Sequence, residues 1–197
     1  MHRSRKQRGT VMRSVMCSLA DIVGSYTGHP TPADSCRARL ANFLRYFEHR
    51  KTIDEAIQAA IMRNHPHQNC LSWKKRRQVH QSLLSAAASL DAESTFEGIF
   101  AIVESCVRPP FKNADLLIYE LSLRLGAYRK ALPTSVYLHS GTLKGAKFIL
   151  GNQALPWAVP LTKLPSAFSP LLPHEAEDCL CIYKAKLEVL RKIGALP

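Results

Sequence analysis

Helical spacing of apolar residues is the feature that most limits the fold of this chain. Apolar residues recur three and four positions apart through most of the sequence, and no segment shows the alternation of a half-buried strand. In the segment 35–51, for example, Leu40, Phe43, Leu44 and Phe47 form one apolar stripe. The pattern predicts an all-α protein: a single helical domain of about eight helices over residues 11–197, preceded by a basic arm at residues 1–10.

Local signals place the ends of several of these helices. Thr52 and Glu55 have the spacing of a capping box, and Gly126 is a natural residue to end the helix that begins at Asp115. Gly141 and Gly145 favour close packing against another helix. A Pro-rich segment, 155–173, is expected to cover the core in an extended conformation. The expected helices span residues 11–24, 35–51, 52–65, 74–90, 96–107, 115–126, 140–150 and 174–194.

The charge balance favours an anionic partner. The chain has 27 Lys and Arg against 15 Asp and Glu, a formal net charge of +12. Nucleic acid is the commonest partner of a compact protein with such an excess. Lys74, Lys75, Arg76 and Arg77 lie in the first turn of an expected helix, where the helix dipole disfavours cations. Bound negative charge would remove that conflict, and a solvated basic face is the open alternative.

The absence of known motifs from the sequence excludes several classes of protein. The sequence has no P-loop, no dinucleotide-binding fingerprint and no zinc-protease motif. No apolar run reaches the length of a membrane span, so we expect no membrane association. The six cysteines are scattered, which favours a reduced, cytoplasmic protein without structural disulfides. We expect a monomer without a cofactor, and without a metal site, because His65 and His67 lack a third ligand nearby.

The segment from Arg108 to Gly151 carries the most specific pattern. An apolar helix is followed by a short polar hairpin, a long apolar helix, the sequence Val136-Tyr137-Leu138-His139 and a helix rich in small residues. This order resembles the core, residues 108–151 here, of the helix-hairpin-helix base-excision DNA glycosylase superfamily. The chain is most similar to uncharacterised bacterial members that share four motifs over about two-thirds of its length: His65 to Gln68, Ile118 to Glu120, Val136 to Thr142, and Glu177 to Lys184.

The resemblance implies that the protein binds double-stranded DNA, extrudes a damaged or modified base and cleaves its N-glycosidic bond. In the superfamily a glycine-containing hairpin binds phosphate and an Asp lies two residues before the histidine. Here the hairpin has Lys112 and Asn113 instead of glycines, and Tyr137 replaces the Asp. The carboxylate would then be Glu120 or Asp115.

The remaining site residues follow from the same resemblance. The base pocket would be lined by His67, Gln68, Tyr119, Tyr137 and His139, with Trp157 as a further aromatic. Besides the hairpin, DNA backbone contacts are expected from Lys74, Lys75, Arg76, Arg77, Thr142, Lys144 and Lys147.

Two other functions remain open at this point. The protein could be a non-catalytic DNA-binding or architectural module that has kept the fold, as the replacement of the Asp by Tyr137 suggests. It could also be a helical adaptor for an acidic protein. If it is a glycosylase, the departures from the superfamily pattern favour an unusual substrate, such as a bulky modified base of phage DNA, and hence a role in defence against phage.

Overall fold

The computed structural model describes residues 18–28, 32–63, 72–109, 111 and 114–196. Within them the protein is all-α apart from one two-stranded sheet, which confirms the predicted class. The α-helices are α1 (Leu19–Thr27), α2 (Cys36–Glu48), α3 (Ile53–Met62), α4 (Trp73–Ser85), α5 (Ala87–Ala92), α6 (Phe96–Val107), α7 (Asp115–Arg129), α8 (Ser140–Leu150), α9 (Pro173–Ile182) and α10 (Lys184–Lys192). Three 3₁₀ turns are η1 (Pro32–Asp34), η2 (Leu161–Lys163) and η3 (Ser166–Phe168). None of the described helices has the length and hydropathy that crossing a membrane requires.

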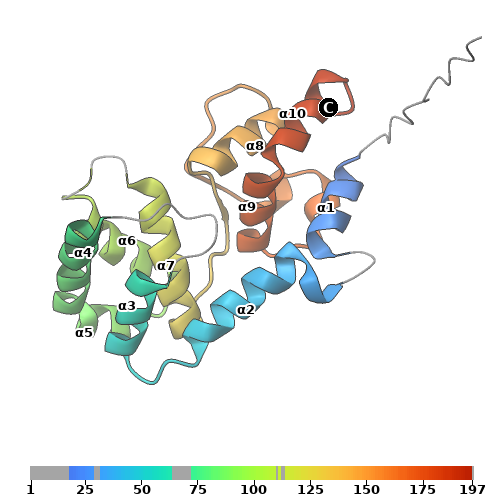
Figure 1. Ribbon diagram of the computed structural model, residues 1–197. Helices are drawn as coiled ribbons and strands as arrows, with labels where there is room; N and C mark the ends of the chain where they lie inside the picture. Colours follow the sequence, from blue (N-terminus) through green and yellow to red (C-terminus); the bar gives the residue numbers. More distant parts are fainter. Residues whose placement is uncertain (1–17, 29–31, 64–71, 110, 112–113, 197) are drawn as a thin grey trace, which may run out of the picture.

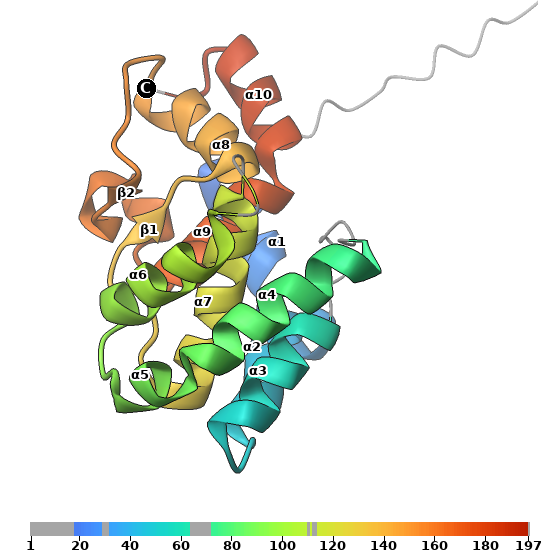
Figure 2. The ribbon, with the colours of Figure 1, turned by 90° about the vertical axis from the view of Figure 1, so that its left-hand side faces the viewer.

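The helices enclose two hydrophobic cores. The first core takes its buried side chains from α2 to α7, and the second takes them from α1, α8, α9, α10 and the 155–173 segment. Figure 1 shows the two groups of helices on opposite sides, with α2 running between them. Helix α2 packs on α7 of the first group and on α9 of the second. Turned by 90°, Figure 2 shows α4 crossing in front of α3, against which it packs.

A short sheet separates the two cores. β1 (Val136–Tyr137) pairs antiparallel with β2 (Ala158–Val159), so that Val136 lies opposite Val159. Because neighbouring side chains of a strand point to opposite faces, Val136 and Leu138 enter the second core, whereas Tyr137 enters the first. These strands were not predicted from the sequence, since two residues are too few to show an alternation.

The structure corrects several predicted helix boundaries. The segment 74–90 is two helices, because the chain bends at Ala86. This residue is both the C-cap of α4 and the N-cap of α5. The segment 174–194 is likewise divided at Tyr183. Helix α7 continues past Gly126 and ends at Lys130, which takes the left-handed conformation with a φ of 57°. In the 155–173 segment, two 3₁₀ turns replace part of the expected extended chain.

The ends of α1 and α3 also differ from expectation. Helix α1 begins with a capping box between Ser18 and Asp21 and ends at Gly28 rather than Gly24, and residues 11–17 lie outside the described part. At α3, the Thr52 hydroxyl accepts from the Glu55 amide, as predicted. The Glu55 carboxylate, however, accepts from the amide of Lys51, so the box is not reciprocal.

Gly145 allows the closest approach between helices in the second core. A Cβ atom at this position would lie 2.5 Å from the backbone oxygen of Leu180 on α9. That atom belongs to a helix backbone and cannot rotate away. The expected role of Gly145 in helix packing is therefore supported.

We predict that Gly145→Ala destabilises the protein by about 1–3 kcal/mol, because the added methyl group forces α8 and α9 apart. Gly24→Ala is the matched control: it also lies inside a helix, but a Cβ there meets nothing within 4 Å. This variant should be neutral or up to about 1 kcal/mol more stable, as expected from helix propensity. Urea unfolding measures both, and equal effects of the two changes would contradict the packing argument.

Candidate functional site

Glu120 is a carboxylate that is crowded by protein atoms but still reached by solvent. It lies on α7, and its side chain keeps 20% of its exposure. Its Oε2 atom is 3.3 Å from Nη2 of Arg124, one turn further along the helix. Burial raises the pKa of Glu120, although the charge of Arg124 opposes that effect. Such a carboxylate holds its proton up to a higher pH than an ordinary glutamate, which is typical of acids that exchange protons in reactions.

Arg124 is the buried cation of the site. Only 3% of its side chain is exposed, and its Nη1 atom donates to the carbonyl oxygen of Ala60 on α3. Its guanidinium lies 5.5 Å from the ring centre of Phe43 on α2. Burial lowers the pKa of Arg124, and the nearby positive charge of Arg76 lowers it further. Arg76, in the first turn of α4, therefore lies within electrostatic reach of Arg124.

A second polar group links α8 to α9 at the boundary between the cores. Nε2 of His139 lies 2.7 Å from Oε1 of Glu177, and the hydroxyl of Thr142 donates to the same oxygen at 2.6 Å. All three side chains are buried. Burial by itself would lower the pKa of His139, but the negative charges of Glu177 and Glu120 outweigh it, and the pKa is raised. The protonated, charged form of His139 is thus favoured beside Glu177.

Aromatic side chains connect this polar group to the surface. The ring centre of Tyr119 lies 5.0 Å from that of His139 and 5.5 Å from that of Tyr137. Tyr137 in turn contacts Phe100 and Trp157, at 5.3 and 6.4 Å. Tyr119, Tyr137 and His139 are at most 6% exposed, whereas Trp157 is 36% exposed. Three of the five residues expected to line a base pocket are therefore packed beneath the surface, with Tyr137 and His139 both against Tyr119.

The hydroxyl of Tyr119 is buried and makes no hydrogen bond of normal geometry within the described part of the chain. Burial raises the pKa of Tyr119, and the charges of Glu177 and Glu120 raise it further. The neutral phenol of Tyr119 is therefore strongly favoured next to these two carboxylates.

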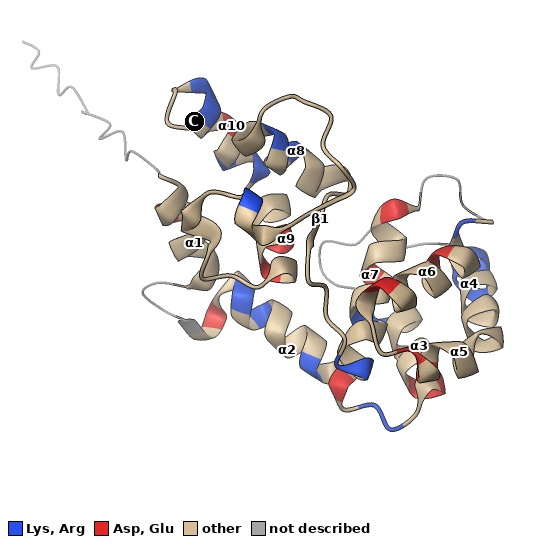
Figure 3. Cartoon of the chain, turned by 180° about the vertical axis from the view of Figure 1, so that it is seen from behind, with Lys and Arg blue, Asp and Glu red and all other residues tan. Residues whose placement is uncertain are grey.

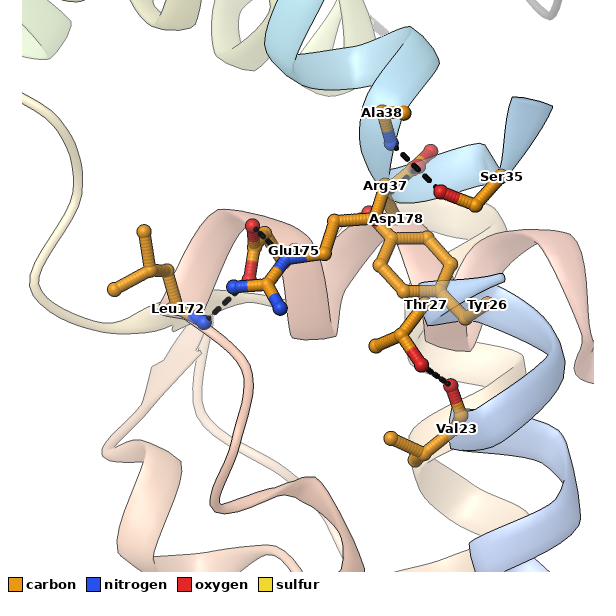
Figure 4. Close-up of polar contacts among 9 residues, drawn as sticks. All are labelled: Val23, Tyr26, Thr27, Ser35, Arg37, Ala38, Leu172, Glu175 and Asp178. Carbon is orange, nitrogen blue, oxygen red and sulfur yellow. Dashed lines mark hydrogen bonds and ion pairs between the residues drawn. The ribbon is translucent and has the colours of Figure 1, made fainter. Parts of the chain in front are cut away.

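Helix α9 holds two more carboxylates that contact other elements. Glu175 accepts from Nε of Arg37 on α2 at 2.8 Å and from the amide of Leu172 at 2.9 Å. Asp178 accepts from the hydroxyl of Tyr26 on α1 at 3.1 Å. Figure 4 shows these residues where α1, α2 and α9 meet. Burial, followed by the charge of Glu177, raises the pKa of Asp178 to about 8.

The predicted DNA-binding residues differ in exposure. Lys74, Lys75, Arg77 and Lys144 are exposed, and Arg76 and Lys147 are half-buried. Figure 3 shows Lys and Arg on α2, α4, α8 and α10. The structure corrects the assignment of Thr142 to DNA binding. Thr142 is fully buried and its hydroxyl donates to Glu177, so it has no surface from which to contact a phosphate.

Asp115 is less suited than Glu120 to the role of a reacting carboxylate. Its side chain is 47% exposed, and its Oδ1 atom accepts from Arg108 at 3.0 Å. The same guanidinium contacts Glu104, so Asp115 belongs to a surface ion-pair group at the start of α7. The predicted His67, Gln68, Lys112 and Asn113, and the basic arm at residues 1–10, lie outside the described residues.

Two residues of the site were not selected from the sequence. Arg124 lies four residues after Glu120 on an otherwise apolar helix, and this spacing was a usable signal for an ion pair. Glu177 is 35 residues from Thr142, and no local pattern connects them. No arrangement of three or more potential metal ligands occurs among the described His, Cys, Asp and Glu residues.

Comparisons with known proteins found no matching family model, no curated relative and no similar solved structure.

We predict that the Asp178 carboxyl makes the folded protein less stable as the pH rises. Its folded pKa of about 8 lies above its ordinary value of 3.8, so the folded state holds this proton more tightly than the unfolded state. Between these two values the unfolded chain loses the proton first, and the stability falls with pH. Asp178→Asn should therefore gain stability relative to the wild type between pH 5 and pH 8, measured by urea unfolding.

Asp91→Asn is the control for this experiment. Asp91 also accepts a hydrogen bond from a tyrosine, Tyr128, but its side chain is 49% exposed. Its stability difference from the wild type should stay nearly constant over the same range. If the two variants respond alike, burial is not the cause of the effect at Asp178.

Proposed function

We propose that this protein binds DNA and hydrolyses the N-glycosidic bond of a damaged or modified base, with Glu120 as the reacting carboxylate. The observation that carries the proposal is the state of Glu120: solvent reaches it, its pKa is raised, and a buried arginine fixes one of its oxygens. The proposal also rests on the sequence resemblance to helix-hairpin-helix glycosylases and on the chain's net charge of +12.

In the proposed reaction the bond between the sugar C1′ atom and the base nitrogen breaks, and its electron pair leaves with the base. Positive charge develops on the sugar, and the ionised carboxylate of Glu120 stabilises it. Water then attacks C1′, Glu120 accepts its proton, and the departing base nitrogen takes up a proton from solvent. The raised pKa of Glu120 strengthens it as the base in this step.

His139 and Tyr119 would act by positioning the groups near Glu120. The charges of His139 and Glu177 both act on the pKa of Glu120, in opposite directions. Tyr119 and Tyr137 form an aromatic support next to α7, and their burial leaves no ring face free for a base in this conformation. An extruded base would instead lie against the exposed side of Glu120.

A non-catalytic DNA-binding role is the second candidate, and it has its own support. Tyr137, which replaces the expected carboxylate, is an integrated member of the first core with aromatic neighbours on several sides. Glu120 has a salt-bridge partner in Arg124, so its presence also satisfies a buried cation. In that case the fold would be retained for binding alone.

We predict that Glu120→Gln abolishes the release of free base and leaves DNA affinity within about threefold of the wild type. Gln keeps the size of the side chain but cannot carry the negative charge that stabilises the sugar cation. The assay incubates the protein with duplexes that contain normal, damaged or bulky modified bases and detects free base and abasic sites. For an active substrate, the rate should rise with pH through a pKa above the ordinary value of Glu, 4.5.

Asp115→Asn is the matched control, because Asp115 lies on the same helix in an exposed ion pair. It should keep base release, since its charge is screened by solvent and paired with Arg108. Loss of release in this variant but not in Glu120→Gln would transfer the role to Asp115. If DNA binds but no substrate yields free base, the binding-only function is correct.

A further inference from the structure

The first turn of α4 combines the most exposed large apolar side chain of the described residues with a run of cations. Trp73 is 67% exposed, and Lys74, Lys75 and Arg77 beside it are also exposed. An indole that is this exposed buries little apolar surface and so contributes little to the stability of the fold. The residues around Trp73 therefore indicate what kind of partner would cover it.

The charges of this turn are not balanced within α4. The helix has no Asp or Glu, and the side chain of Ser72 makes no capping hydrogen bond. Four adjacent cations at the positive end of a helix repel one another and the helix dipole. A bound polyanion would relieve both effects. Helix α4 packs against α3, and Arg124, which contacts Glu120, donates to Ala60 on α3, so α4 lies beside the helix that anchors the candidate site.

Lys75 joins the turn to the segment between α6 and α7. Its Nζ atom lies 4.9 Å from the ring centre of Phe111. Phe111 is four residues before Asp115, the first residue of α7, on which Glu120 lies. Lys75 therefore lies beside the segment that leads into α7.

We propose that Trp73, with Lys74 and Arg77, is a stacking platform for an unpaired DNA strand next to the Glu120 site. Trp73 and Arg77 are one helical turn apart and lie on the same side of α4. The indole stacks on a base, and the two cations neutralise the phosphates on either side. Alternation of an aromatic face with cations is how proteins hold single strands without reading sequence. This proposal rests on the proposed function and extends it, because it makes DNA that is unpaired beside the reacting base the preferred substrate.

An anionic membrane surface is the competing occupant, and the observations favour DNA. Binding in a membrane interface requires a broad apolar face, usually with several large residues. In the first turn of α4 Trp73 is the only large apolar residue, and the others are cations. The arrangement suits the spacing of bases and phosphates better than a layer of lipid.

The fluorescence of Trp73 provides the test. The chain has two tryptophans, Trp73 and Trp157, so Trp157→Phe leaves Trp73 as the only indole and keeps an aromatic ring beside Tyr137. Oligo(dT) of about ten nucleotides should quench this fluorescence, because stacking on a base does so. Trp73→Ala should weaken oligo(dT) binding about tenfold, and Trp73→Phe should recover part of the loss.

Salt dependence separates the cations from the indole. Lys74→Ala and Arg77→Ala should each lower the slope of log K against log[salt] by about 0.7, whereas Trp73→Ala should leave the slope unchanged. Lys186→Ala is a control cation on α10, exposed but distant in the fold from α4, and it should leave both affinity and slope unchanged.

The outcomes keep this proposal distinct from the proposed function. Glu120→Gln should show the same quenching, so quenching without base release from any substrate would support the platform and refute the glycosylase. Oligo(dT) binding without a change in Trp73 fluorescence, or with wild-type affinity in Trp73→Ala, would overturn the platform. A response to vesicles of phosphatidylglycerol and phosphatidylcholine, with none to oligo(dT), would assign the turn to a membrane surface instead.

Discussion

The structure depends on the polar contacts of three acidic side chains of α9, of which Glu175 and Glu177 are buried and Asp178 is half-buried. Glu175 contacts α2 through Arg37, Glu177 contacts α8 through Thr142 and His139, and Asp178 contacts α1 through Tyr26. Each carboxylate would be costly to bury alone, and each is compensated by donors from a different element. Helix α9 therefore fixes the positions of three neighbours by polar contacts whose geometry is more specific than that of apolar packing. These contacts hold α8 in place, and α8 in turn holds His139 against Tyr119.

The same contacts explain the electrostatic state of the site. Besides burial, the charge of Glu177 raises the pKa of Glu120 and of Asp178, and the charge of Glu120 adds to the effect on Asp178. The charges of Arg124 and His139 lower the pKa of Glu120. Two cations and three acidic side chains of α7, α9 and the start of α8 thus act on one another. Glu120 keeps an exposed portion of its side chain, at 20%, and Asp178 is half-buried. Solvent therefore reaches this group of charges at Glu120 and at Asp178.

Much of the fold could be predicted from the sequence, because helix periodicity and caps are local. The stripe of α2 and the start of α3 are where the spacing of Leu40 to Phe47 and the hydroxyl of Thr52 place them. The breaks at Ala86 and Tyr183 could not be predicted, since neither residue is a helix breaker and the bend is imposed by packing. At the site, Glu120 stood out as an acid on an apolar helix. Thr142 was predicted to bind DNA because a hydroxyl at the start of a helix can donate to a phosphate. It donates instead to the carboxylate of Glu177, which is too distant in the sequence for a local pattern to indicate the contact.

The alternation of Val136, Tyr137 and Leu138 between the two cores also bears on the dynamics of the molecule. Strand β1 is only two residues long and lies between the cores, so local opening there can leave each core folded as a cooperative unit. In native-state hydrogen exchange, the two cores would then act as separate foldons, and the amides of β1 would exchange before those in the middle of α7.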